Sequence, residues 1–106
     1  MKIASVTDSA IIFDNGNNIT YFHNPDCCED NYADFSVINE NVINYDYNFP
    51  EKLRFKFIEG GGFKFGDTNA WIFVPCYSEQ NGYYSTEIDI LYNNEVVLSG
   101  NCEMKW

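Results

Sequence analysis

The densest group of chemically reactive side chains lies between residues 23 and 30. This segment holds one imidazole, two thiols and three carboxylates: His23, Asp26, Cys27, Cys28, Glu29 and Asp30. Such groups bind zinc, and Cys76 or Cys102 could complete a tetrahedral site. The spacing argues against a metal, because zinc ligands are usually paired two to four residues apart and adjacent side chains point in different directions. We expect no metal and no other cofactor, with one cysteine packed in the core and the other in the loop.

The same segment places a cysteine near the lone histidine, as in a catalytic thiol pair. Its surroundings are unsuitable, because Asp26, Glu29 and Asp30 would raise the pKa of a neighbouring thiol and reduce the nucleophilic thiolate. Reactive cysteines generally occupy electropositive sites. We expect neither Cys27 nor Cys28 to be catalytic.

Two further features could support chemistry, and each has a simpler structural explanation. Glu87 and Asp89 would share one face of a strand, as expected of a solvated face, although paired carboxylates can also act as acid and base. The glycines at 60–62 follow a strand but precede no Lys-Ser or Lys-Thr pair, so they indicate a turn and not a phosphate-binding loop. The residues therefore predict a protein that is not an enzyme.

Length and composition bound the class of protein. A chain of 106 residues fits one domain, residues 1–106, and its aromatic fraction of 18% favours packed β-strands. It has no apolar run of membrane-spanning length, and Met1–Ser5 does not resemble a signal peptide. We expect a cytoplasmic protein with reduced cysteines and no membrane partner.

Charge is unevenly distributed along the chain. The net charge of −10 disfavours binding to nucleic-acid backbone or to anionic membrane. Between Ile3 and Glu51 the sequence has nine acidic residues and no Lys or Arg. The main basic stretch follows, with Lys52, Arg54, Lys56 and Lys64. The sequence predicts a polarised surface.

Alternating apolar residues and turn signals predict eight strands. Asn-Gly at 15–16 predicts a hairpin between 10–13 and 18–23, and Asn93-Asn94 predicts another between 83–92 and 95–99. Further strands are expected at 53–57, 63–65, 71–74 and 102–106, the strand at 71–74 being buried on both faces and stopped by Pro75. The prediction is a mainly β fold (β or α+β): an antiparallel sheet, sandwich or small barrel of six to eight short strands. A short helix or irregular turn could follow the cysteine loop, between Tyr32 and Ile38.

Two segments resemble the signatures of a protein family. Asn18–Phe35, with Asp-Cys-Cys-Glu at 26–29, and Ser78–Ser85, with Asn-Gly-Tyr-Tyr-Ser at its end, are similar to an uncharacterised family of short bacterial and phage proteins. The family has no assigned function. The resemblance implies one shared feature made of Asp26, Cys27, Cys28, Glu29, Asn81, Gly82, Tyr83, Tyr84 and Ser85.

Small size, acidity and the lack of a catalytic constellation favour a binding protein. The residues we expect to contact a protein partner with a basic surface are Asp26, Glu29, Asp30, Asp34 and Glu40. If the chain comes from a phage or mobile element, it could inhibit a host defence nuclease by occupying its basic nucleic-acid channel, as anti-CRISPR proteins do. Acidity that serves only solubility remains an alternative.

Two other binding functions are weaker alternatives. Tyr83, Tyr84, Trp71 and Trp106 could line a small-ligand pocket, although aromatic residues at such spacings more often belong to the core. RNA could be contacted by Lys52, Arg54, Lys56 and Lys64, with Phe63 and Phe65 as stacking surfaces. The charge of the whole chain opposes this second alternative.

Overall fold

The structure is a computed structural model that describes residues 1–23, 30–40, 43–80, 82 and 84–105. Within these residues there are ten strands and two short helices. The strands are β1 (Ile3–Val6), β2 (Ala10–Phe13), β3 (Asn18–Phe22), β4 (Asp30–Ala33), β5 (Arg54–Ile58), β6 (Gly62–Gly66), β7 (Trp71–Glu79), β8 (Glu87–Tyr92), β9 (Glu95–Asn101) and β10 (Glu103–Lys105). The helices are the 3-10 helix η1 (Phe35–Glu40) and the single turn α1 (Ile43–Asp46).

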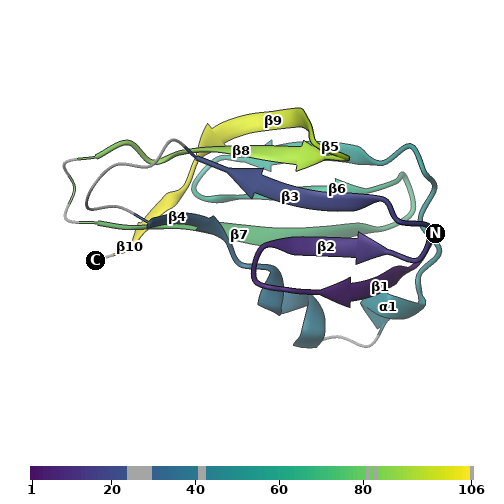
Figure 1. Cartoon of the computed structure of the whole chain (residues 1–106). Coiled ribbons are helices and arrows are strands. Elements are labelled where there is room, and N and C mark those ends of the chain that lie inside the picture. Colours follow the sequence, from purple (N-terminus) through teal and green to yellow (C-terminus); the bar gives the residue numbers. More distant parts are fainter. Residues whose placement is uncertain (24–29, 41–42, 81, 83, 106) are drawn as a thin grey trace.

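The strands form two sheets that pack face to face (Figure 1). One sheet is antiparallel and has the order β1-β2-β3-β8-β9. In the other, β5, β6 and the first half of β7 are antiparallel neighbours, while the second half of β7 pairs with β4 and with the parallel strand β10. The fold is therefore mainly β, as predicted, and among the proposed architectures it is a sandwich.

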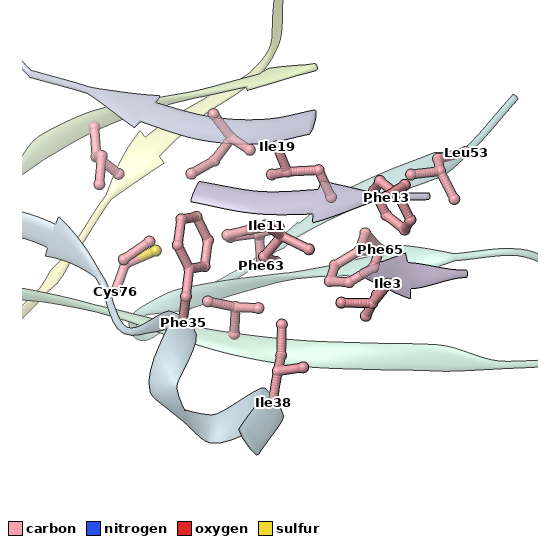
Figure 2. Packing of buried hydrophobic residues seen from close by; sticks show 14 of the residues in the cluster. Ile3, Ile11, Phe13, Ile19, Phe35, Ile38, Leu53, Phe63, Phe65 and Cys76 are labelled. Atoms are coloured by element: carbon pink, nitrogen blue, oxygen red, sulfur yellow. The ribbon is translucent and has the colours of Figure 1, made fainter. Parts of the chain in front are cut away.

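Strand alternation supplies the core between the sheets. Ile11 and Ile19 of the first sheet pack in one buried cluster with Phe63 and Phe65 of the second (Figure 2). Ile90 of β8 belongs to the same cluster and is also fully buried. A fully buried side chain of this size contributes roughly 1.5–3 kcal/mol. Facing apolar stripes thus hold the two layers together.

Most predicted turns are confirmed. Gly16 has φ +91° in the β2–β3 hairpin, where Phe13 donates its N–H to the Asn17 carbonyl. Asn93 and Asn94 have φ angles of 51° and 67°, as a tight hairpin between β8 and β9 requires. These short-range signals work because a two-residue turn needs positive φ angles that Asn and Gly tolerate.

The strand that begins at Trp71 differs from the prediction in length and exposure. β7 continues through Pro75 to Glu79, and Trp71 and Phe73 are 39% and 50% exposed, so only one face of its first half is buried. Cys76 donates its N–H to the Gly61 carbonyl, and the Pro75 carbonyl accepts the Asp34 N–H from the opposite edge, so the N–H that Pro75 lacks would face that edge, just beyond the last register pair of β4, Ala33 with Cys76. Proline therefore interrupts no hydrogen bond here.

Three further differences concern the polar segments. β1 and β4 were not predicted, and the segment expected to be helical or irregular contains both the end of β4 and η1. The strand predicted from Tyr83 begins only at Glu87. Before it, the Ser85 carbonyl accepts hydrogen bonds from the side chains of Asn31 and Gln80, which replace a strand partner.

Candidate functional site

An acidic groove lies where β3, β4 and the end of β7 meet. Its volume is about 280 Å³, and four carboxylates, two phenols and three smaller or apolar residues line it: Asp8, Asp30, Asp34, Glu79, Tyr21, Tyr32, Ala33, Phe35 and Ser36. In Figure 1, β4 runs beside β7 and leads into the helical turn below it. This concentration of carboxylates makes the groove the candidate functional site.

Alternation along β4 and into Asp34 separates buried residues from polar ones. Alternation directs Asn31 and Ala33 inward, where each is 1% exposed, and turns Asp30, Tyr32 and Asp34 to the other side, where they supply polar groups to the groove. The register puts Asp30 directly opposite Glu79 of β7. Like charges at opposite cross-strand positions are destabilising, and a bound cation would relieve that repulsion.

The two tyrosines experience the negative charge of the groove. Burial, then Glu79, then Asp34 and Asp30 raise the pKa of Tyr32 to about 12, and the Tyr32 hydroxyl donates to Glu79 Oε1 at 3.2 Å. Burial, followed by Asp30 and Asp8, also raises the pKa of Tyr21. Both phenols therefore stay neutral at physiological pH and can donate hydrogen bonds.

Asn31 supports the groove from inside. Its side-chain nitrogen donates to the carbonyls of Ser85 and Glu87, each at 3.0 Å, and its oxygen accepts from the Ser78 hydroxyl. Gln80 joins the same network through the Ser78 hydroxyl and the Tyr84 N–H. These bonds fix β4 against the segment that precedes β8.

The predicted protein-contacting residues fall into three groups. Asp30 and Asp34 line the groove, and Glu40 ends η1. Asp26 and Glu29 lie outside the described residues. Asp8 and Glu79 were missed: Asp8 lies in the turn between β1 and β2, and Glu79 reaches the groove through pairing with a strand that the sequence did not reveal.

The signature residues are described only in part. Cys27, Cys28, Asn81 and Tyr83 lie outside the described residues, as do Asp26 and Glu29. Gly82 is exposed with φ +94°. Tyr84 and Ser85 contact the Asn31 network, which joins β4, near the end of the first signature, to the end of the second.

The predicted RNA-contacting residues lie elsewhere. Arg54, Lys56 and Lys64 share the outer face of β5 and β6, and Lys52 is exposed just before β5. The proposed stacking residues Phe63 and Phe65 are wrong, because both alternate into the core and have no exposed surface. The ligand-pocket hypothesis includes two tryptophans. Trp71 is exposed on β7 and does not belong to the core, whereas Trp106 lies outside the described residues.

Cys76 and Cys102 are buried thiols. Burial, and then proximity to Cys102, raises the pKa of Cys76 far above its ordinary value, so its thiol is protonated. Among the described residues, no three His, Cys, Asp or Glu side chains are grouped so that they could hold a metal ion.

No helix in the described part of the chain is long and apolar enough to cross a membrane. Comparison with known proteins found no matching curated protein and no matching solved structure. A family model does match residues 1–90, which include the whole groove and all of β1 to β7. The chain therefore belongs to the family described as a domain of unknown function, DUF7448.

Proposed function

We propose that the chain is a non-enzymatic binding protein whose acidic groove receives an arginine or lysine side chain from the basic surface of a protein partner. The observation that carries the proposal is the placement of Asp30 directly opposite Glu79, with Asp8 and Asp34 lining the same groove. A cationic side chain would replace repulsion between these carboxylates with attraction.

The remaining features of the groove suit such a ligand. Carboxylates accept paired hydrogen bonds from a guanidinium group, and tyrosine rings attract cations. A volume of about 280 Å³ lies below the range of roughly 300–1,000 Å³ typical of drug-sized ligands, so it suits one side chain. The net charge of −10 would also speed association with a basic surface.

The partner class can be narrowed by one further proposal. If the chain comes from a phage or mobile element, a host defence nuclease is a partner with the required basic surface. In that case, reversing Asp30, Asp34 and Glu40 together should abolish complex formation with the nuclease, and the complex should weaken strongly as salt is added. A complex that survives the triple reversal would contradict this narrower proposal.

The groove itself is tested with a fluorescently labelled arginine-rich peptide and a glutamine-substituted peptide of equal length. The groove variant carries Asp30→Asn, Asp34→Asn and Glu79→Gln, which preserve side-chain size. The matched control carries Asp46→Asn, Glu59→Gln and Glu95→Gln, all at exposed positions outside the groove. Both variants change the net charge from −10 to −7, because each loses three carboxylates.

The expected result is a loss of arginine-peptide affinity of about tenfold in the groove variant, since each solvent-accessible pair contributes a modest share. The control should lose less than about threefold at physiological salt, where distant charges are screened. Equal losses in the two variants would show that only net charge matters, and the acidity would then serve solubility.

A further inference from the structure

We infer that the outer face of β5, β6 and the first half of β7 binds single-stranded nucleic acid. This surface, the basic-aromatic face, consists of Arg54, Lys56, Lys64, Trp71 and Phe73. It belongs to the sheet that lies behind the β1-β2-β3-β8-β9 sheet in the view of Figure 1. The inference does not depend on the acidic groove.

The strand register brings these five side chains together. Arg54 pairs with Gly66, which pairs with Trp71, and Lys56 pairs with Lys64, which pairs with Phe73. Directly paired residues of antiparallel strands point to the same side of a sheet. The intervening residues, among them Phe63 and Phe65, point into the core. Three cations and two aromatic rings therefore share one exposed face.

The aromatic rings on this face are unusually accessible. Phe73 is 50% exposed and Trp71 is 39% exposed. An added Cβ at Gly62 would lie 2.6 Å from the Phe73 ring, so this glycine gives the ring room to lie across β6. Lys64 Nζ lies 4.6 Å from the centroid of the Trp71 ring, which holds a cation beside the aromatic surface.

This combination fits a single strand of RNA or DNA better than an acidic protein segment. Lysine and arginine bind phosphates, and exposed rings stack on unpaired bases, which an acidic peptide does not offer. A flat sheet that presents both is a common platform for single strands. Because Trp71 and Phe73 are exposed, the face favours single-stranded nucleic acid over an acidic peptide as its ligand.

The acidic surroundings do not cancel this local charge. Trp71 lies eight residue steps from Glu79 of the groove, on the order of 26 Å along β7. The Debye length is only about 8 Å at physiological salt, so the groove acids are screened from the face. Of the nearer acids, Glu59 lies in the β5–β6 turn and Glu103 of β10 packs against Gly61, both beyond the Gly62 end of the face. Asp67 is bound by the Tyr47 hydroxyl and the N–H groups of Asn69 and Ala70.

The test measures fluorescence anisotropy of a labelled single strand of about ten nucleotides, as RNA and as DNA, with full-length protein. Lys56→Glu is compared with Lys2→Glu, which introduces the same charge outside the face. Phe73→Ala is compared with Phe22→Ala, because Phe22 is a similarly exposed ring (51%) on the other sheet. Circular dichroism verifies that each variant is folded. In a Trp106→Phe background, Trp71 is the one remaining tryptophan, and its emission reports stacking.

We expect binding at low salt, with a slope of about −2 for log affinity against log salt, because three cations contact phosphates. Phe73→Ala should lower affinity at least about fivefold, whereas Phe22→Ala and Lys2→Glu should change it little. The nucleic acid should quench Trp71, and an oligoglutamate peptide should not. No binding at about 50 mM salt would overturn the inference, as would equally tight binding of oligoglutamate with no effect of Phe73→Ala.

Discussion

Tyr32 connects the electrostatics of the groove to a measurable pH dependence. Its pKa is 10.0 in an unperturbed chain and about 12 in the folded protein. Between these values the folded chain holds more protons than the unfolded chain, so the free energy of unfolding falls as pH rises. We predict that Tyr32→Phe reduces this alkaline loss of stability, measured by urea unfolding at pH values on either side of 10.

Other tyrosines contribute to the alkaline loss of stability, because Tyr21, Tyr47 and Tyr92 also have raised pKa values. The loss should therefore shrink in Tyr32→Phe without disappearing. Glu79→Gln should reduce it too, since Glu79 both repels the phenolate and accepts the phenol hydrogen bond. An alkaline loss identical in wild type and both variants would contradict this account of the groove.

Substitution of Asn31 tests how much its buried hydrogen bonds stabilise the protein. Replacing it with leucine would leave the Glu87 carbonyl without the Asn31 donor and the Ser78 hydroxyl without its acceptor, and the Ser85 carbonyl would keep only its hydrogen bond from Gln80. We predict a loss of about 2–4 kcal/mol in the free energy of unfolding, because each unsatisfied buried group is unfavourable by about 1–3 kcal/mol. Asn69→Ala, at an exposed site, should change stability by less than about 0.5 kcal/mol in the same measurement. Equal effects would contradict the role of the network.

The sequence pattern marks only some of the groove residues. Asp30 and Asp34 stand out because they lie in an acidic segment without a cation. Asp8 and Glu79 have no such signal, since what brings them to the groove is the β1–β2 turn and the pairing of β7 with β4. That pairing depends on tertiary contacts of Asn31, which a local pattern cannot show.

Gly100 of β9 allows the edge strands of the two sheets, β9 and β5, to approach each other closely. A Cβ at this position would lie 2.7 Å from three ring atoms of Phe57 in β5. We predict that Gly100→Val destabilises the protein by about 1–3 kcal/mol, because the added side chain overpacks this contact. Thermal unfolding should show the loss, and Val97→Ala, at an exposed site of the same strand, should show little. A Gly100→Val protein as stable as wild type would rule out the close contact.

The eight predicted strands were recognisable because turn chemistry and alternation are local. The two missed strands lack these signals. β1 (Ile3–Val6) has a register irregularity between Ile3 and Ser5, which breaks the period of two. β4 begins with Asp-Asn, residues that are depleted in strands, and its buried Asn31 is compatible with the core only because partners on other segments satisfy it. Pro75 was expected to end the strand, but β7 continues through it. Whether a proline is tolerated there depends on which edge of β7 pairs with β4, and the local sequence does not show this.

Two surfaces of opposite charge lie along β7, with the acidic groove beside its end and the basic-aromatic face beside its start. The sequence indicated this polarity through the acidic segment 3–51 and the basic stretch that follows. It could not indicate that one nine-residue strand would connect the two surfaces. The ligands proposed for the two surfaces would therefore not compete for the same residues.

The most direct test of the proposed function is an NMR titration of the labelled full-length protein with the arginine-rich peptide. We expect amide chemical-shift changes to concentrate at the groove, in residues 30–36 and at Asp8 and Glu79, and to saturate with one affinity. The glutamine-substituted peptide should produce none of these changes. Shifts spread evenly over exposed acids such as Glu59 and Glu95, or located away from the groove, would contradict the proposal.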